Sequence, residues 1–298
     1  ACWCLARCGR SPPAARRVYG PSAWSAPSLA GAGSSSKRSD FSERLESQGV
    51  ATYSLKPNRR QELEAILRDI QPTICLFDRF FAEEAYSFVV RDAVPDALRV
   101  LDTQDLHFLR NGRHDVLKAA TKKGGLKSLR DIVGHVPGAD SPALLRELAA
   151  LYRSDLSIMC SPVEVEMLKL YYGLTPSKVA LSSFLCSAAP LAEIPGYAER
   201  QHFMTIGNFK HPPNMDSVKW LAGELWPEIR QRLAAIGMEV EMHIYGAYPS
   251  QEAMQLNQPK QGLRVLGHAP SLDIMRNYRA CLTPLRFGAG LKGKVLDS

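Results

Sequence analysis

Glycines and basic side chains alternate in the segment 285–295, which reads Leu-Arg-Phe-Gly-Ala-Gly-Leu-Lys-Gly-Lys-Val. It follows an apolar run that predicts a buried strand over 281–285, and the residues after it favour the start of a helix. Glycines let backbone N–H groups approach an anion closely, and a helix N-terminus adds about half a positive charge. Arg286, Lys292 and Lys294 would complement a diphosphate, since lysines at a helix start oppose the dipole unless an anion balances them. The sequence therefore predicts a phosphate-binding turn.

Two general phosphate motifs fit this turn incompletely, and a glycine turn without a ligand is a further interpretation. Gly288, Gly290 and Gly293 match the GxGxxG dinucleotide fingerprint, but no acidic residue follows at the required distance. Gly288 and Gly293-Lys294 match the GxxxxGK pattern of a P-loop, but Val295 stands where serine or threonine would hold magnesium. Neither motif is therefore preferred.

Cysteine and histidine spacing predicts no metal site. The seven cysteines form no CxxC pair, and the seven histidines show no spacing typical of metal ligands. Cys75, Cys160 and Cys281 lie in apolar, strand-like runs and are expected to be buried free thiols. His202 and His243 are expected to be packing or surface residues.

The formal net charge of +7 is concentrated at one end of the sequence. Residues 1–39 contain six basic residues and no acidic one, so the other 259 residues carry 31 basic and 30 acidic groups. A nucleic-acid-binding protein usually concentrates positive charge on its folded face. No run approaches the roughly 18 to 20 apolar residues needed to cross a bilayer. We therefore expect no nucleic-acid partner and no transmembrane span.

Residues 1–40 are rich in alanine, serine, proline, glycine and arginine and show no helix or strand period. The composition resembles an organellar transit peptide, and a disordered low-complexity leader is the alternative interpretation. We expect this segment to lie outside the fold. The protein is expected in the cytoplasm, or in an organelle if the leader is a transit peptide.

From residue 41 onward, strand-like and helical patterns alternate. Strands are predicted over 51–55, 73–77, 98–101, 156–160 and 179–182 in a first block, and over 203–206, 240–245, 263–266 and 281–285 in a second. Such alternation is typical of an α/β fold with doubly wound parallel sheets. The aperiodic segment 188–198 contains two prolines and predicts a linker between domains at 41–190 and 200–298.

Helix boundaries are marked by capping residues. Ser141-Pro142 and Ser161-Pro162 each place a serine N-cap before a proline at the first helical position. Glu164 would complete a capping box with Ser161, and Gly173 would end that helix. In the second block, an apolar stripe predicts one long helix over 214–235.

Residues 200–298 resemble the C-terminal domain of family 4 (group 1) glycosyltransferases. The resemblance is carried by the segments 202–214, 243–250, 267–269 and 283–290, and upstream the segments 77–80 and 99–107 resemble the N-terminal, acceptor-side domain of that family. It implies the GT-B architecture, in which two Rossmann-like domains bind a nucleotide diphosphate sugar at the carboxyl ends of the C-terminal strands. It also implies that the first strand of the N-terminal domain is missing before residue 41 and that the C-terminal domain is incomplete.

The resemblance implies a set of donor-binding residues. They are Gly207, Asn208, Arg286, Gly288, Gly290, Lys292, Lys294 and Asp297. Lys292 would meet the diphosphate oxygens and carry electrostatic catalysis. Asp297 falls on the second carboxylate of an E-x7-E pair, while Ala289 replaces the first. Ala289 lacks the carboxylate that would make the usual contact to the transferred sugar.

On the acceptor side, the resemblance points to Asp105 and His107 as catalytic residues. Gln104-Asp105 stands where many relatives have His-Asp, so His107 would serve the acceptor hydroxyl instead, with a structural histidine as the alternative. The implied activity is transfer of a hexose to a glycan, lipid or other acceptor. In this family the anomeric configuration is usually retained and no metal or other cofactor is usually needed. We expect the 298-residue chain alone to be inactive.

Two other functions remain open at this level. A non-catalytic GT-B-like module that binds a ligand or partner is favoured by Ala289 and Gln104, which both depart from the family pattern. A P-loop nucleotidase is disfavoured by Val295 and by the lack of a second acidic motif.

Overall fold

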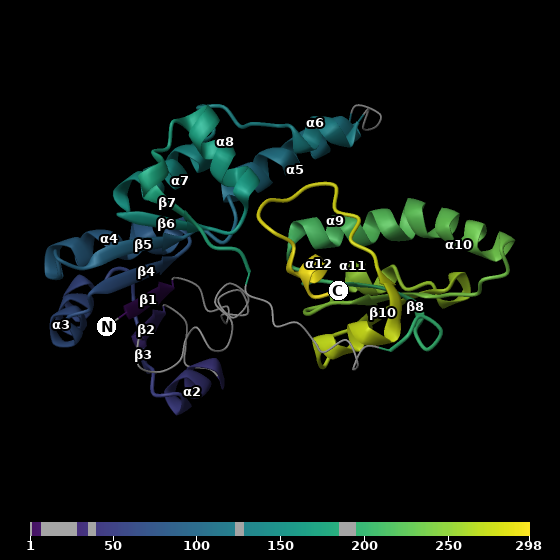
Figure 1. The fold of residues 1–298 in the computed structure, drawn as a ribbon, viewed down its shortest axis with the longest axis horizontal. Helices are drawn as coiled ribbons and strands as arrows, with labels where there is room; N and C mark the ends of the chain where they lie inside the picture. Colours follow the sequence, from purple (N-terminus) through teal and green to yellow (C-terminus); the bar gives the residue numbers. More distant parts are fainter. Residues whose placement is uncertain (1, 7–28, 35–39, 123–127, 185–194) are drawn as a thin grey trace. The chain divides into compact units, whose positions relative to one another are not determined.

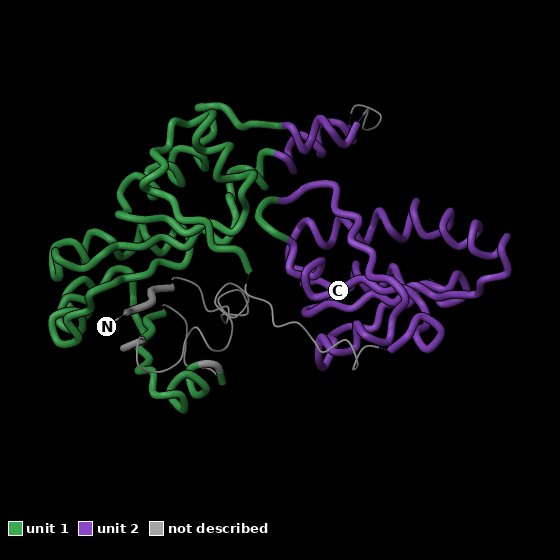
Figure 2. Tube along the Cα trace, in the orientation of Figure 1, with its two compact units in different colours: residues 1–112, 135–185, 289–291 green, residues 113–134, 186–288, 292–298 purple. Residues whose placement is uncertain are grey.

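The computed structural model describes residues 2–6, 29–34, 40–122, 128–184 and 195–298. The chain divides into two compact units, coloured separately in Figure 2. Unit 1 comprises Ala1–Gly112, His135–Leu185 and Ala289–Leu291; unit 2 comprises Arg113–Gly134, Cys186–Gly288 and Lys292–Ser298. The boundary between His135–Leu185 of unit 1 and Cys186–Gly288 of unit 2 lies close to the linker expected at 188–198. Residues 188–194 of that linker lie outside the described part of the chain.

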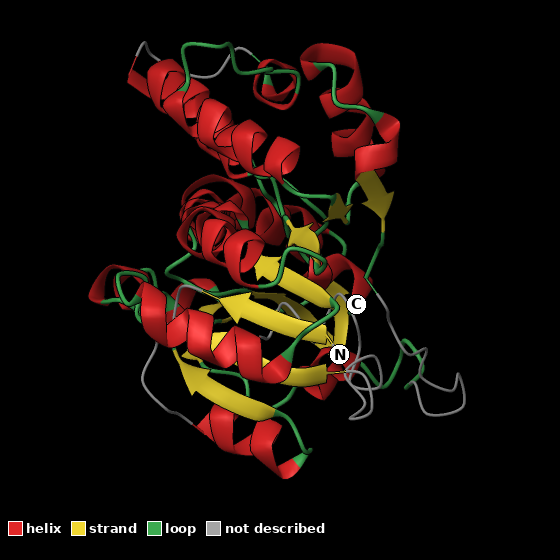
Figure 3. Cartoon of the chain, turned by 90° about the vertical axis from the view of Figure 1, so that its left-hand side faces the viewer, coloured by secondary structure: helices red, strands yellow, loops and turns green. Residues whose placement is uncertain are grey.

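Unit 1 contains a seven-stranded parallel sheet of order β3-β2-β1-β4-β5-β6-β7. Its strands are β1 Cys2–Ala6, β2 Leu29–Ser34, β3 Ala51–Ser54, β4 Ile74–Asp78, β5 Leu98–Asp102, β6 Leu156–Met159 and β7 Val179–Leu181. The chain runs outward from β1 to β3 and then returns past β1 to β4, which is the doubly wound topology expected from the alternating pattern. Figure 3 shows these strands with helices on both sides of the sheet.

The expectation that residues 1–40 lie outside the fold is wrong for two segments. β1 pairs with both β2 and β4 at the centre of the sheet, and β2 pairs with β3. The first strand of this domain is therefore present within the segment taken as a leader. The Cys2–Ala6 run is short and contains no β-branched residue, so it carries little of the signal that marks a buried strand in sequence.

The helices in the first half of the chain follow the predicted caps closely. They are α2 Asp40–Ser47, α3 Arg60–Ile70, α4 Phe80–Ala93, α5 His107–Lys122, α6 Leu129–Val133, α7 Pro142–Arg153 and α8 Pro162–Tyr172, with the 3-10 turn η1 Pro176–Lys178. The Ser141 hydroxyl accepts the Leu144 N–H, Ser161 accepts the Glu164 N–H, and Gly173 ends α8 with φ 65°. Each satisfies backbone groups that a helix end leaves unpaired.

One continuous apolar core holds unit 1 together. Its members include Leu67, Phe77, Leu101, Leu106 and Leu151, each 2 % exposed or less. Because they come from α3, β4, β5, the start of α5 and α7, the core fixes where the carboxyl ends of the strands lie.

Unit 2 contains a four-stranded parallel sheet of order β10-β9-β8-β11. Its elements are β8 Gln201–Ile206, α9 Pro212–Trp220, the π-helical η3 Leu221–Leu225, α10 Trp226–Ala235, β9 Met242–Tyr245, α11 Gln251–Gln255, η4 Pro259–Gln261, β10 Leu263–Gly267, η5 Leu272–Asn277, β11 Tyr278–Cys281 and α12 Gly293–Leu296. The predicted helix at 214–235 is present but contains the π-helical turn η3. Its buried residues Val218, Leu221 and Trp226 pack on Met242 and Ile244 of β9.

The last strand differs from its prediction. β11 ends at Cys281 rather than at residue 285, although the Leu282 N–H still donates to Met204 O at 2.7 Å. Pro284 interrupts the apolar run because it has no N–H to donate to a strand ladder. The glycine turn therefore begins after a four-residue extension rather than directly at the strand end.

Within the described residues, no helix is long and apolar enough to cross a membrane.

Candidate functional site

The direction of the unit 2 sheet reverses between β8 and β11. The chain steps from β8 to β9 and β10 on one side and then returns to add β11 on the other side. In open parallel sheets, ligands bind outside the carboxyl ends of the strands at such a reversal, because the two flanking loops diverge there. The two flanking loops here are 207–211 after β8 and 282–292 after β11, and the sequence predicted both as donor-binding segments.

The Asn214 side chain joins the two loops. The Lys294 ammonium group donates to Asn214 Oδ1 at 3.0 Å, and Asn214 Nδ2 donates to Asn208 O at 3.1 Å. A Cβ on Gly207 would lie 2.6 Å from Asn214 Cγ, so Gly207 lies directly against this amide. Asn208 turns its own Oδ1 to the Lys210 N–H at 2.8 Å. Three predicted donor-site residues, Gly207, Asn208 and Lys294, therefore meet around Asn214.

Arg286 is paired within the protein. Its guanidinium group forms a bidentate ion pair with Asp216 at 2.5 and 2.9 Å and lies 5.6 Å from the centre of the Trp220 ring. The hydrogen bonds to Asp216 raise the pKa of Arg286 above its ordinary value. Because a bidentate carboxylate satisfies the guanidinium fork, Arg286 fixes the loop against α9 in this structure rather than presenting an open anion site.

The remaining residues of the predicted turn divide between the two units. Lys292 is the N-cap of the one-turn helix α12, and its Nζ would lie 2.9 Å from a Cβ placed on Gly288. Gly290 belongs to unit 1 with φ 65°, and its N–H donates to the buried carboxylate of Glu164. Asp297 is exposed at the end of α12. The Gly290 amide is thus already paired, and the predicted anion-binding turn has Lys292 and Lys294 as its nearby cations.

Glu164 shows how the predicted capping box is altered. Its backbone N–H is capped by Ser161 as expected, but its carboxylate reaches Gly290 instead of returning to the helix start. A Cβ on Gly290 would lie 2.8 Å from Asp105 Cβ, so glycine is required there both by the close approach and by the left-handed backbone.

Two aspartates end neighbouring strands in unit 1. Asp78 of β4 and Asp102 of β5 are register partners, and Asp78 is paired with Arg79 at 2.6 Å. Asp102 is 4 % exposed and accepts the backbone N–H and side-chain amide of Gln104 at 3.2 and 2.5 Å. Burial, and next the negative charge of Asp78, raise the pKa of Asp102 to about 7.

The two predicted acceptor-side residues are close together. Asp105 is paired with Arg110, and its Oδ1 lies 3.8 Å from His107 Nε2. His107 begins α5, where the buried carboxylate of Glu147 accepts the His107 and Phe108 backbone N–H groups at 3.1 and 2.9 Å. Gln104 adopts φ 61°, a strained value for a non-glycine residue that its two bonds to Asp102 hold in place.

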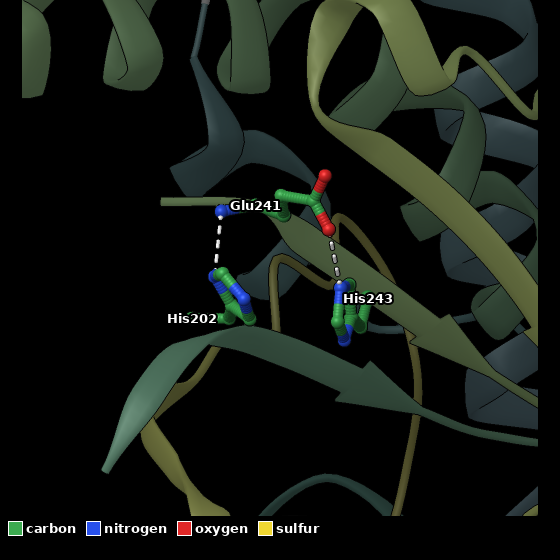
Figure 4. Close-up of side chains that lie close together, drawn as sticks. All are labelled: His202, Glu241 and His243. Atoms are coloured by element: carbon green, nitrogen blue, oxygen red, sulfur yellow. Dashed lines mark hydrogen bonds and ion pairs between the residues drawn. The ribbon is translucent and has the colours of Figure 1, made fainter. Parts of the chain in front are cut away.

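A third polar cluster lies elsewhere in unit 2, near the amino-terminal ends of β8 and β9. Figure 4 shows His202, Glu241 and His243, whose potential metal-ligand atoms lie within 4.8 Å of one another. His202 Nδ1 accepts the Glu241 N–H at 3.1 Å, and His243 is bonded to Glu241 and to the Tyr278 hydroxyl at 3.0 and 2.8 Å. The structure therefore brings together two histidines that the sequence treated separately.

These groups do not form a favourable cation site. Both Glu241 oxygens accept the Arg264 guanidinium, which lowers the pKa of Glu241 to about 2 and places a positive charge beside the carboxylate. His202 Nδ1 already faces a backbone donor, so a metal at either ring nitrogen would break or oppose that bond. The cluster is best described as a hydrogen-bond network that ties β8, β9, β10 and β11 together.

Several residues of the two sites could not be identified from sequence. They are Asp102, Glu147, Glu164, Asn214 and Asp216. The side-chain partners of Glu147, Asp216 and Glu164 lie 39 or more positions away in the sequence, so these contacts carry no local signal. Asn214 and Asp216 had a weak one, because they follow a double proline in the first turn of a helix after a glycine-containing loop.

Comparisons with known proteins identify the fold. No family model and no curated protein matches the chain. Among solved structures, the lipopolysaccharide outer core galactosyltransferase WaaB in its apo form matches 94 % of this chain and 73 % of its own, at 10 % identity and a TM-score of 0.54. Acinetobacter baumannii MurG (9 % identity, 94 % and 70 % coverage) and a mutant of S. aureus TarM (9 %, 75 % and 40 %) both give a TM-score of 0.48.

The likeness to WaaB establishes the fold alone. The chain has the α/β architecture of the GT-B type, with two Rossmann-like parallel-sheet units. It spans 40 % of the length of the TarM structure and of the GtfA/B complex chain that it matches.

Proposed function

We propose that this protein is a glycosyltransferase that binds a nucleotide diphosphate sugar at the carboxyl end of the unit 2 sheet and transfers the sugar to a glycan, lipid or other acceptor. The observation that carries the proposal is the meeting of Gly207, Asn214 and Lys294 at the β8/β11 reversal. The Asn214 amide covers Gly207 and accepts the Lys294 ammonium group, so a phosphate group would take the place of this amide beside the lysine. Such a position at a reversal suits a phosphate, because the ammonium charge is near and Gly207 has no side chain of its own.

The proposed chemistry needs stabilisation of a departing diphosphate. Lys294 is placed to exchange the neutral Asn214 oxygen for a phosphate oxygen, and Lys292, two residues earlier, adds a second cation. An ion pair between an ammonium group and a phosphate is stronger than the hydrogen bond that Lys294 donates here to the neutral Asn214 oxygen. Arg286 would support the loop through Asp216, and α12 is too short for its dipole to contribute much. Anomeric retention and a hexose donor are further parts of the proposal.

Binding of a nucleoside diphosphate tests the donor site. Calorimetric titration with UDP, GDP and ADP should find binding of at least one, and Lys294→Ala should weaken it about 10- to 100-fold because a charge-assisted bond of about 1.5–3 kcal/mol is lost. Lys292→Ala should weaken it about 10-fold.

The control variant removes an exposed basic residue of unit 2 that is not part of the proposed donor site. Arg232 of α10 is 77 % exposed and pairs with Glu228 on the same helix, so Arg232→Ala should leave the affinity unchanged. Absence of binding to all three nucleotides, or equal affinity of wild type and Lys294→Ala, would remove the proposal.

A further inference from the structure

His107 is held between two carboxylates by aromatic side chains. Its ring centre lies 5.5 Å from that of Phe80 and 5.9 Å from that of Phe81, at interplanar angles of 67° and 51°. In this orientation Nδ1 lies 3.6 Å from Glu147 Oε1, while Nε2 lies 3.8 Å from Asp105 Oδ1. The two ring nitrogens therefore have different surroundings, and the proton of the neutral ring is not shared equally between them.

The carboxylate of Glu147, which faces Nδ1, determines which ring nitrogen of His107 carries the proton. The Glu147 side chain is 1 % exposed, and its carboxylate accepts two backbone N–H groups at the start of α5. His107 Nδ1 is shielded from solvent and has no hydrogen-bond partner among the described residues. A lone pair on Nδ1 would face a buried carboxylate oxygen and be repelled, whereas an N–H would be attracted. Neutral His107 therefore carries its proton on Nδ1.

The surroundings of Nε2, which faces Asp105, are more exposed and less negative than those of Nδ1. Asp105 is 18 % exposed and its charge is balanced by Arg110, so it attracts a proton on Nε2 less strongly. The His107 side chain keeps 15 % of its surface exposed although Nδ1 is buried. Nε2 is thus the ring nitrogen that an outside molecule reaches, and in the neutral ring it carries a lone pair.

We propose that Glu147 is a positioning residue that holds His107 in the Nδ1–H tautomer, so that Nε2 accepts a hydrogen bond from a sugar hydroxyl of the acceptor. The identity of the incoming hydroxyl rests on the proposed function, but the tautomer does not. A carboxylate that orients a histidine through one nitrogen while the other meets the reacting hydroxyl is a recurrent arrangement in enzymes. Here it is supplied by α7, 40 residues away from the histidine in sequence.

Nitrogen NMR of the histidine rings tests the tautomer without any assay of transfer. The chain has seven histidines, so ¹⁵N-histidine labelling gives a resolvable set, and the His107 signals are assigned by their loss in His107→Asn. In the wild type at a pH where the ring is neutral, the Nδ1–H form should exceed the Nε2–H form by at least 5-fold. In Glu147→Gln the excess should fall below 2-fold, because an amide can either donate or accept.

A matched control and a hydroxyl probe complete the test. Glu166→Gln removes an exposed glutamate that pairs with Lys169 on α8, and it should leave the His107 spectrum unchanged. Titration with methyl α-D-glucopyranoside should move the His107 Nε2 signal but not Nδ1, and the movement should shrink at least 3-fold in Glu147→Gln.

The inference is overturned by a predominant Nε2–H form in the wild type, by an unchanged tautomer ratio in folded Glu147→Gln, or by no Nε2 response to the sugar. If Glu147→Gln does not fold, because the start of α5 loses its cap, the wild-type tautomer decides alone. Nucleoside diphosphate binding by Glu147→Gln should equal that of wild type, so failure of the donor proposal and failure of this inference give different results.

Discussion

Replacing Gly246 with alanine is expected to lower the free energy of unfolding of unit 2 by about 3 kcal/mol. Gly246 follows β9, and its N–H donates to Gly267 O at 2.7 Å. A Cβ at this position would come closer than 3.0 Å to the Gly207 carbonyl oxygen and to the Phe209 ring. Neither neighbour can yield easily, since one is backbone and the other is a buried aromatic ring of the unit 2 core.

Urea unfolding followed by tryptophan fluorescence measures the effect, because Trp226 is buried in the unit 2 core. Gly223→Ala is the matched control: it adds the same methyl group inside the helical segment Leu221–Leu225, where nothing lies within 4 Å of the new Cβ. Alanine should be neutral or stabilise that helix by about 0.5–1 kcal/mol. Equal stability of Gly246→Ala and wild type would show that the loops after β8 and β9 are not packed as described.

Asp102→Asn is expected to remove a pH dependence of stability that the wild type shows between about pH 4 and pH 7. The pKa of Asp102 rises from its ordinary value of 3.8 to about 7 in the folded chain, because of burial and the nearby Asp78 charge. Between these values the folded state binds more protons than the unfolded state. Stability conferred below pH 4 is therefore lost as pH rises, and the loss approaches about 4 kcal/mol above pH 7.

The asparagine variant keeps the shape of the side chain but has no proton to lose. At pH 8 it should be more stable than wild type by up to about 4 kcal/mol, and at pH 4 the two should agree within about 1 kcal/mol. Urea unfolding at half-unit pH steps measures this. Asp115→Asn, which changes a side chain that is 76 % exposed on α5, should follow the wild-type curve. Parallel curves for wild type and Asp102→Asn would contradict a neutral, buried Asp102.

The regular elements were predictable because their signals are local. Ser141, Ser161 and Gly173 marked helix ends that the structure confirms, since capping depends on residues within one turn. The parallel, doubly wound sheets followed from alternating strands and helices, and the structure confirms them as well. The prediction failed at β1, a short strand with no β-branched residue, and at the end of β11, where the apolar run continued past the last strand residue.

The donor-site loops were located by sequence, but the partners of their side chains were not. Arg286 was expected to face a diphosphate, and only the fold shows that Asp216 lies beside it. Gly290 was expected to offer its N–H to an anion, and the anion beside it is Glu164, 126 residues away. The roles of Lys292, Lys294 and Asp297 remain predictions for the binding experiments.

The sequence by itself determined the alternating α/β pattern, the caps and the two glycine-containing loops, because spacing along the chain sets helix and strand periods and turn geometry. Tertiary structure alone decided which charges are balanced: Glu147 beside His107, Asp78 beside Asp102, Asp216 beside Arg286. These pairings depend on distances across the sheet ends, and electrostatic interactions are set by distance and burial rather than by order in the chain.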